Sequence, residues 1–215
     1  MSELLGFSGV RQRFSGNQTL TLPDWTLQRG EHCLIMGPSG SGKTTMLSLA
    51  GGLLTADAGH VSLDRQPLHE LGEAQRDRLR ARCVGLIFQT LHLVSALNVG
   101  RNLALAQYLA GQTVDWDRIR TLLTELAVDH LIQRKPDTLS QGQAQRVAIA
   151  RATVTSPQLV LADEPTAALD DRNCERTIEL LLSQAQACGA SLVIATHDQR
   201  LKSYIKTTIQ LDVPT

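Results

Sequence analysis

A glycine-rich stretch near the first third of the chain has the residue types and spacing of a site for nucleotide phosphates. It reads Gly-Pro-Ser-Gly-Ser-Gly-Lys-Thr and fits the pattern G-x-x-x-x-G-K-[ST]. In this pattern glycines let backbone N–H groups turn inward around the phosphates, the lysine reaches the β and γ oxygens, and the final hydroxyl binds Mg²⁺. The residues expected to contact the nucleotide are Gly37, Pro38, Ser39, Gly40, Ser41, Gly42, Lys43, Thr44 and Thr45.

Two adjacent acids follow an apolar run much later in the chain. Asp163 and Glu164 come directly after the run 159–162, which predicts a buried strand that ends at these carboxylates. Asp163 is then placed to hold Mg²⁺ together with Thr44, and Glu164 to orient or deprotonate an attacking water. A solvated acidic turn is the alternative interpretation, and the phosphate-binding pattern in the same chain favours the catalytic one.

A histidine and a glutamine occupy matching positions after two other apolar runs. His197 follows the run 192–196, where an imidazole can contact a γ-phosphate and the attacking water. Gln89 follows the run 83–88, where its amide can contact both the metal and the water. We therefore expect Lys43, Glu164, His197 and Gln89 to be the catalytic residues, and Thr44, Gln89 and Asp163 to be the metal ligands. Ordinary loop polarity is the alternative for Gln89.

The elements that must position these residues alternate between strand and helix patterns. Strands are expected over 4–10, 19–27, 33–36, 60–63, 83–88, 159–162, 191–195 and 205–211, with a turn at 15–17. Helices are expected from residue 46 and over 73–82 and 172–187, and helical periodicity dominates between 90 and 136. This alternation predicts an α/β protein with a largely parallel, doubly wound sheet, whose ligand lies at the carboxyl ends of the strands.

Composition limits the remaining choices. The chain has 215 residues, 42% of them hydrophobic, which suits one domain with lobes. Lys plus Arg and Asp plus Glu number 21 each, so no nucleic-acid partner is expected. The basic stretch Arg76 to Arg82 is interpreted as a solvated helix face, with contact to anionic headgroups or to an acidic partner loop as alternatives. The four cysteines show no paired C-x-x-C spacing, which predicts reduced core thiols. The lack of a signal peptide or apolar span predicts a cytosolic location.

The segment Leu139-Ser-Gln-Gly-Gln143 and the run that follows to Arg151 resemble the signature sequence and helix of ABC ATPases. Together with the motifs above and Ala168-Leu-Asp170, the chain is similar over nearly its whole length to the nucleotide-binding domain of ABC transporters. The resemblance implies a P-loop NTPase fold with a mostly parallel core sheet, a small N-terminal antiparallel β-subdomain and an inserted α-helical subdomain. We expect a single ABC ATPase domain over 1–215, with the core in 1–89 and 157–215 and the helical lobe at about 90–156.

The same resemblance implies an ATPase that binds ATP and Mg²⁺ as a head-to-tail homodimer. Each ATP would lie between the phosphate loop of one copy and the signature of the other, with Ser140, Gly142 and Gln143 in contact with it. Asp170 would link the two sites, and Phe14 would stack on adenine, packing being its alternative role. Gln141 stands where the family usually has glycine, and we expect it to tune activity.

The segment 82–102 is similar to the lipoprotein-releasing and macrolide-exporter group of LolD, MacB and FtsE types. That group implies integral membrane permease subunits with few spans, as in FtsX and MacB, which hold the ATPase at the cytoplasmic face of the inner membrane. Residues 91–97 would then line the groove for a permease coupling helix, or else pack the helical lobe. An importer ATPase and a soluble ABC ATPase acting on ribosomes or DNA are the alternatives, and the cargo stays open.

Overall fold

A parallel five-stranded sheet forms the centre of the molecule in the computed structural model, which describes residues 2–14, 18–167 and 169–213. Its order is β10-β4-β9-β8-β7, and its strands are β4 (His32–Met36), β7 (Val84–Ile87), β8 (Leu159–Asp163), β9 (Ser191–Thr196) and β10 (Thr208–Gln210). All but the edge strand β10 are short, mainly apolar runs, because both faces of a parallel sheet are buried. All their carboxyl ends meet at one edge, so the segments that follow β4, β7, β8 and β9 meet there too.

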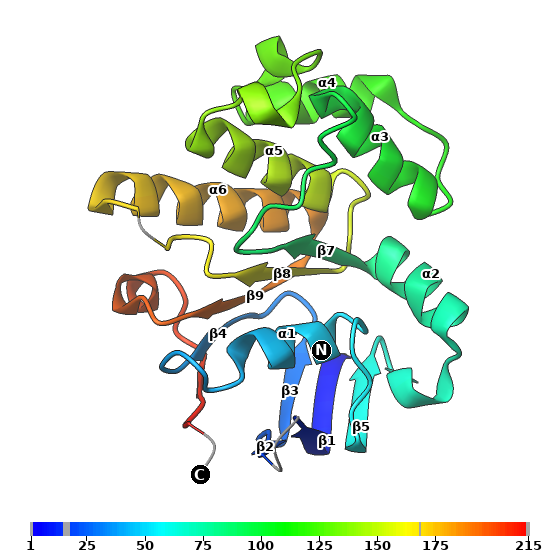
Figure 1. The fold of residues 1–215 in the computed structure, drawn as a ribbon, viewed down its shortest axis with the longest axis vertical. Helices are drawn as coiled ribbons and strands as arrows, with labels where there is room; N and C mark the ends of the chain where they lie inside the picture. The colour runs from blue at the N-terminus through cyan, green and yellow to red at the C-terminus, as the bar shows by residue number, and fades with distance from the viewer. Residues whose placement is uncertain (1, 15–17, 168, 214–215) are drawn as a thin grey trace.

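Alternating side chains of this sheet supply two separate cores. Cys33 and Ile35 of β4 pack in a cluster with Met46 and Leu49 of α1 (Lys43–Ala50), whereas Leu34 and Met36 pack on the opposite face in a cluster with α5 and α6. Successive side chains of a strand point to opposite faces, so this division follows directly from the period of two. In Figure 1, α1 lies between the central sheet and the second sheet at the bottom of the view.

The second sheet is antiparallel and comes from the N-terminal part of the chain. It has the order β2-β1-β5-β6, with β3 also paired to β1, and comprises β1 (Glu3–Arg13), β2 (Thr19–Thr21), β3 (Trp25–Gln28), β5 (Ala58–Leu63) and β6 (Gln66–Pro67). The single strand expected over 19–27 is interrupted at 22–24, where Pro23 has no N–H to pair. The turn expected at 15–17 lies outside the described residues.

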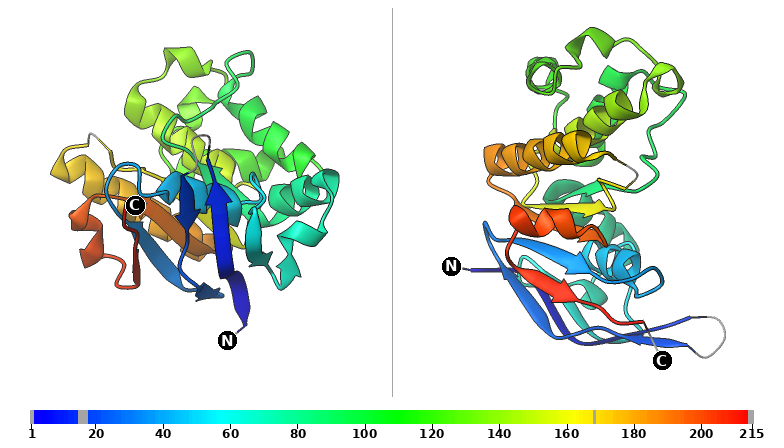
Figure 2. Two further views of the ribbon diagram at one scale, coloured as in Figure 1. Left: turned by 60° about the horizontal axis from the view of Figure 1, so that its bottom comes forward. Right: turned by 90° about the vertical axis from the view of Figure 1, so that its left-hand side faces the viewer.

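Helices cover the other face of the central sheet and build a lobe beside it (Figure 2). Of the core helices, α6 (Asp171–Cys188) packs on this other face, whereas α2 (Glu73–Cys83) contributes Leu79 and Cys83 to the cluster that contains α1. A short 3-10 helix, η1 (Leu68–Glu70), precedes α2. The lobe contains α3 (Val99–Leu109), α4 (Trp116–Glu125), η2 (Asp129–Leu131), η3 (Pro136–Thr138) and α5 (Gln141–Thr153). The mixed architecture of parallel core, antiparallel N-terminal sheet and inserted helices confirms the predicted fold class.

The last predicted strand, over 205–211, is wrong in its first part. A 3-10 helix, η4 (Gln199–Ser203), precedes it, and the backbone N–H of Ile205 donates to the carbonyl of Leu201 at 3.1 Å. Because that N–H is used in a helical turn, Ile205 cannot join the sheet ladder, although its side chain is buried. The strand therefore starts at Thr208.

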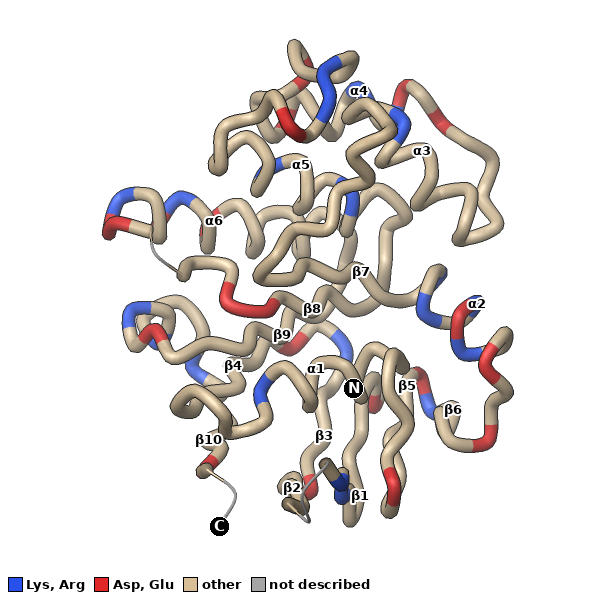
Figure 3. The backbone as a smooth tube through the Cα atoms, viewed as in Figure 1, with Lys and Arg blue, Asp and Glu red and all other residues tan. Residues whose placement is uncertain are grey.

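Acidic and basic residues lie close together along α2 and α6 (Figure 3). On α2, Arg80 pairs with Asp77 at 2.7 Å and Arg76 donates to the carbonyl of Leu71, whereas Arg78 and Arg82 are exposed. The cysteines in the described part of the chain are free thiols. Within the same described ranges, no helix is long and apolar enough to cross a membrane.

Candidate active site

The phosphate loop connects β4 to α1 and needs its glycines for steric reasons. Gly40 and Gly42 have φ values of +82° and +93°, in the left-handed region that favours glycine. A Cβ on Gly42 would also lie 2.5 Å from the Cδ2 atom of Leu20. Because α1 begins at Lys43, the first N–H groups of this helix have no carbonyl one turn earlier to bond and are directed at the loop. The loop thus presents backbone donors and a helix N-terminus to an anion.

Lys43 folds back over the loop that it follows. Its Nζ atom donates to the carbonyl oxygens of Gly37 at 2.8 Å and Pro38 at 3.0 Å, and it lies 3.6 Å from Oε1 of Glu164. The side chain is nearly buried, so its ammonium group depends on these oxygens for solvation. A phosphate oxygen in the loop can replace them, which is the chemistry expected of a P-loop lysine.

Thr44 and Asp163 form an oxygen pair suited to a hard cation. The Thr44 hydroxyl donates to Oδ2 of Asp163 at 2.8 Å, while Oδ1 of Asp163 is buried with no hydrogen-bond partner among the described residues. Burial raises the pKa of Asp163, and the hydrogen bond from Thr44 opposes that shift.

An unpartnered buried carboxylate oxygen beside a hydroxyl fits Mg²⁺, which is usually held by one or two protein oxygens plus substrate phosphates. No cluster of three or more His, Cys, Asp or Glu side chains suited to a metal occurs in residues 2–14, 18–167 and 169–213. When bound, Mg²⁺ supplies charge neutralisation for the phosphate oxygens.

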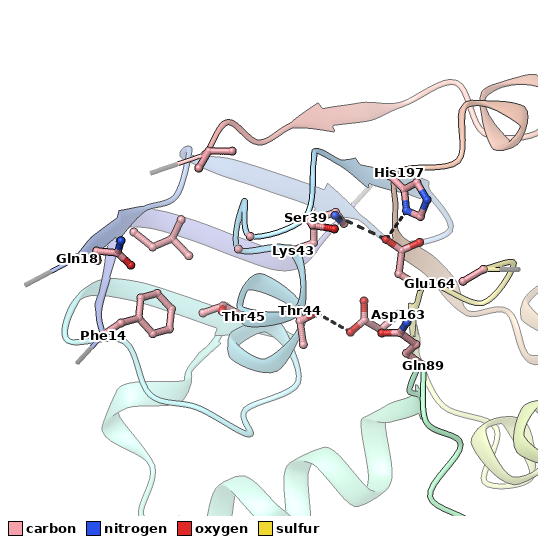
Figure 4. Close-up of a pocket in the computed structure, with 15 residues that line it drawn as sticks. Phe14, Gln18, Ser39, Lys43, Thr44, Thr45, Gln89, Asp163, Glu164 and His197 are labelled. Atoms are coloured by element: carbon pink, nitrogen blue, oxygen red, sulfur yellow. Dashed lines mark hydrogen bonds and ion pairs between the residues drawn. The ribbon is translucent and has the colours of Figure 1, made fainter. Parts of the chain in front are cut away.

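Glu164 and His197 face each other across the ends of β8 and β9. Nδ1 of His197 lies 2.9 Å from Oε1 of Glu164 (Figure 4). The hydroxyl of Thr196 donates to Oε2 of Glu164 at 3.1 Å. The Glu164 backbone has a φ of +47°, a left-handed conformation that is unfavourable for a residue with a Cβ atom. Its N–H donates to the carbonyl of Ala195 at 2.8 Å, which helps to hold this conformation. Glu164 is thus a nearly buried carboxylate fixed by neighbours on both oxygens.

One cavity of about 620 Å³ joins these groups. Of the residues expected to bind nucleotide or metal or to act in catalysis, it is lined by Phe14, Ser39, Gly40, Gly42, Lys43, Thr44, Thr45, Gln89, Asp163, Glu164 and His197. Gly37, Pro38 and Ser41 belong to the loop but do not line the cavity. Figure 4 shows Phe14 and Gln18 at the end away from Glu164, so the cavity is long enough to extend from the acids to an aromatic ring.

Four other predicted residues lie away from this cavity. Ser140 and Gln143 cap α5 reciprocally: the Ser140 N–H donates to Oε1 of Gln143 at 2.9 Å, and the Gln143 N–H donates to the Ser140 hydroxyl at 3.4 Å. Gly142 lines a second cavity of about 700 Å³, which also contacts Gln89 and Glu164. Asp170 caps α6 by accepting from the N–H of Asn173 at 2.9 Å. The Ala168 position of the expected 168–170 motif lies outside the described residues.

The residues that sequence reasoning missed are polar groups that hold the catalytic ones. Thr196, fully buried at the end of β9, supports Glu164, and Thr166 donates to Oδ2 of Asp198 at 3.1 Å. The sequence does indicate Thr196, because its hydroxyl comes at the end of a mainly apolar strand, directly before His197. Gln18, Leu20, Ala167 and Val213 line the nucleotide-sized cavity without any distinguishing sequence pattern.

The fold and the site together define a class of protein. A parallel α/β sheet carries a phosphate loop at the carboxyl end of one strand, and an acid pair ends a second strand of the same sheet. This is the arrangement of a P-loop nucleoside triphosphatase, in which the loop binds phosphates and the acids serve metal and water.

Comparison with known proteins narrows the class to a family. The family model for the ABC transporter matches residues 20–167. The lipoprotein-releasing system ATP-binding protein LolD of Xylella fastidiosa (strain Temecula1) is 38% identical over 190 residues, covering 87% of this chain and 79% of LolD. A Staphylococcus saprophyticus protein assigned by name to hemin import, HrtA, is also 38% identical, over 88% of this chain and 86% of its own length.

A solved structure supports the same assignment. The ATP-binding cassette MJ0796, in a dimeric post-hydrolysis state with ADP and Pi, superposes with a TM-score of 0.86 and 31% identity, covering 97% of this chain and 94% of that one. The chain therefore belongs to the ABC transporter family as an ATP-binding subunit with ATPase activity.

Proposed function

We propose that the chain is the ATP-hydrolysing subunit of an ABC transporter and works as a head-to-tail homodimer beneath a membrane permease. One observation carries the proposal. Ser140 and Gln143 form the exposed N-terminus of α5, yet neither lines the cavity that contains Lys43 and Asp163. An exposed helix N-terminus outside that cavity can serve a nucleotide bound to a second copy, and the dimeric state of the relative MJ0796 supports such a pair.

The proposed domain arrangement assigns different tasks to the two parts of the chain. Residues 1–89 and 157–215 form the nucleotide-binding core, and residues 90–156 form the helical lobe that carries Ser140, Gly142 and Gln143. In this proposal the whole of 1–215 is one ABC ATPase domain. Asp170, at the start of α6, contacts the opposite copy and links the two sites, while Phe14 stacks on the adenine ring.

The proposed chemistry uses the geometry of the acids and the histidine. The phosphate loop and Lys43 bind the β- and γ-phosphates, and Thr44, Asp163 and Gln89 provide oxygen ligands for Mg²⁺. Glu164 accepts the proton of the attacking water, because its carboxylate is nearly buried and fixed between Thr196 and His197. His197 contacts the γ-phosphate and keeps Glu164 oriented.

Coupling to a membrane partner follows from differential binding. ATP that bridges two copies stabilises the closed pair, and loss of the γ-phosphate removes that bridge. A two-state closure of this kind can do mechanical work on any protein attached to both copies. The subunit thus supplies the movement, whereas cargo choice belongs to the permease.

A groove between α2 and α3 is the proposed permease-docking site. It encloses about 520 Å³ and is lined by apolar side chains that include Phe88, Leu105 and Leu109, with Val94 from the expected 91–97 segment. Leu93 of that segment instead packs against the core. In this proposal Val94 therefore belongs to the docking groove and Leu93 to the packing of the lobe. Arg151 fixes the segment by donating to the carbonyls of His92 at 2.5 Å and Leu91 at 2.8 Å. An apolar helix laid in this groove is the expected partner element.

The proposed permease is of the few-span, mechanotransmitting kind, and it would hold the subunit at the cytoplasmic face of the inner membrane. The likeness to the lipoprotein-releasing protein LolD supports this choice. The equal identity to HrtA, named for hemin import, keeps an importer ATPase as the second candidate. Co-purification with the permease, and that permease's number of spans, separates the two.

The catalytic assignment is tested with Glu164→Gln, which keeps size and hydrogen bonding but removes the base. We expect this variant to bind ATP, to form a stable ATP-bound dimer and to lose ATP hydrolysis by about 10²-fold or more. ATPase assays and size-exclusion chromatography on the membrane-purified complex measure both properties. Parental turnover by Glu164→Gln would show that another group activates the water.

A further inference from the structure

Arg200 makes hydrogen bonds to two segments that have separate roles in the proposed mechanism, the 169–171 segment and the loop after β9. It lies in η4, three residues after His197, and its side chain contacts residues from two parts of the chain. Its guanidinium donates to Oδ2 of Asp198 at 2.7 Å, to Oδ1 of Asp171 at 2.5 Å and to the carbonyl oxygen of Leu169 at 3.3 Å. Its Nε atom adds a bond to Oδ1 of Asp198 at 2.9 Å. Arg200 therefore joins the 169–171 segment to the loop after β9.

On one side this cross-link continues to the catalytic base. The Asp198 N–H donates to the Thr196 hydroxyl at 3.0 Å, and that hydroxyl donates in turn to Oε2 of Glu164 at 3.1 Å. Asp198 also accepts from the Thr166 hydroxyl, which is fully buried two residues after Glu164. The loops that hold Glu164 and His197 are thus connected to Arg200 through hydrogen bonds of ordinary length.

On the other side the cross-link reaches the surface beside α6. Leu169 and Asp171 flank Asp170, the residue proposed to contact the opposite copy. The Asp171 side chain is 94% exposed and the Arg200 side chain 39%. In Figures 1 and 3 the start of α6 and the helical turn η4 lie at the same edge of the molecule, where blue and red segments face each other. A second copy that docks on this edge would act directly on the Arg200 contacts.

Arg200 pairs with two carboxylates at once, those of Asp198 and Asp171. Arg200 is the described cation in hydrogen-bond contact with Asp198 and Asp171, and it holds the pKa of Asp198 down to about 2 through its hydrogen bonds. The pair with Asp171 is exposed and contributes little to overall stability. The planar fork of Arg200, however, fixes the relative position of its partners in a way that a lysine cannot.

We propose that Arg200 is a positioning residue that transmits docking of the second copy from the 169–171 segment to Glu164 and His197. This inference rests on the proposed function, because it needs a second copy at the 169–171 segment. Without Arg200 the 169–171 segment loses its direct hydrogen bonds to the loop after β9, and ATP binding no longer places Glu164 correctly for attack.

The test compares Arg200→Ala with the parent in the membrane-purified complex. We expect kcat to fall by about tenfold, since small misplacements of a catalytic group have effects of this order, while KM for ATP stays within about twofold. Cooperativity of hydrolysis in ATP concentration should also decrease, which a purely structural defect would not produce at unchanged thermal stability. Arg200→Lys should restore part of kcat.

Two further variants make the result decisive. Arg120→Ala removes an exposed arginine that pairs with Asp117 on α4, away from the site, and should leave kcat and cooperativity unchanged. If the contact to Asp171 transmits the effect, Asp171→Ala should lower kcat, and the double variant with Arg200→Ala should be no slower than Arg200→Ala alone. Parental kcat in Arg200→Ala, or a loss matched by Arg120→Ala, overturns the inference. The proposed function fails separately, if Glu164→Gln still hydrolyses ATP.

Discussion

At the scale of single residues, the two adjacent acids after β8, Asp163 and Glu164, differ in how well their carboxylate oxygens are hydrogen-bonded. Asp163 has a buried, unpartnered oxygen and a pKa that burial raises, so its charge destabilises the nucleotide-free protein. Glu164, in contrast, has neighbours on both oxygens. The residue proposed as a Mg²⁺ ligand is thus the one with an unpaired oxygen.

Asp163→Asn should therefore make the nucleotide-free chain more stable and the enzyme inactive. Removing the buried charge while keeping an acceptor for Thr44 should add about 1 kcal/mol to the free energy of unfolding, within the usual range for an unsatisfied buried group. For a chain of this length that corresponds to a rise in Tm of roughly 2–4 °C. Differential scanning calorimetry and an ATPase assay check both effects. A fall in Tm would show that the carboxylate is stabilised by contacts of its own.

The stability difference between Asp163→Asn and the parent should increase with pH. Because the folded-state pKa of Asp163 lies above its ordinary value of 3.8, the native state keeps this proton over a window in which the unfolded chain has lost it. Stability from this group therefore falls as pH rises through that window. The stability advantage of Asp163→Asn should grow with pH and then level off above the raised pKa. Asp198 acts in the opposite direction, since its pKa of about 2 means that its contribution is lost as pH falls below 3.8.

At the scale of elements, the N-terminus of α5 combines a structural and a proposed catalytic task that can be separated. The Ser140 hydroxyl caps the helix, and an aspartate can cap equally well but carries a negative charge. Ser140→Ala should cost about 1 kcal/mol of stability, whereas Ser140→Asp should cost little. If this terminus binds a γ-phosphate, Ser140→Asp should nevertheless abolish hydrolysis by repulsion. Thermal unfolding and ATPase assays on both variants test this, and an active Ser140→Asp would place the phosphate elsewhere.

The elements that the sequence predicted well are those whose position depends on local pattern. Apolar runs ending in Gly37, Gln89, Asp163 and His197 indicated strands that end at one edge, because the strands of a buried parallel sheet are continuous apolar segments. The break at Pro23 has a local signal in the sequence, since proline has no N–H for the sheet ladder. The shorter last strand had none, since Ile205 is apolar and buried whether it pairs in a sheet or packs below a helical turn.

The contacts around the site were less predictable for a physical reason. Arg200, Asp198 and Thr166 meet because the loops after β8 and β9 are neighbours in space, and sequence spacing does not give the side-chain directions in such loops. The capping role of Ser140 was suggested by its place before a helix, but its separation from the Lys43 cavity within one chain required the structure.

At the scale of the whole molecule, a head-to-tail pair predicts complementation between two inactive chains. Lys43→Ala damages the phosphate loop and Ser140→Asp the signature, so each should be inactive alone. In a mixed pair one site has both defects and the other has neither. With random pairing of equal amounts, about half of the pairs are mixed and each has one intact site of two, so about a quarter of parental activity should return. Activity is measured after co-expression of both chains with the permease. A mixture as inactive as its components would mean that one chain supplies both halves of a site.

The left-handed backbone at Glu164 has a consequence for how this protein can evolve. A non-glycine residue at a φ of +47° costs on the order of 1–2 kcal/mol that a glycine would recover. Selection for stability alone would thus favour replacing Glu164, whereas selection for ATP turnover keeps it. In a lineage released from the need to hydrolyse ATP, this position should be among the first to drift, and it should drift towards glycine or asparagine.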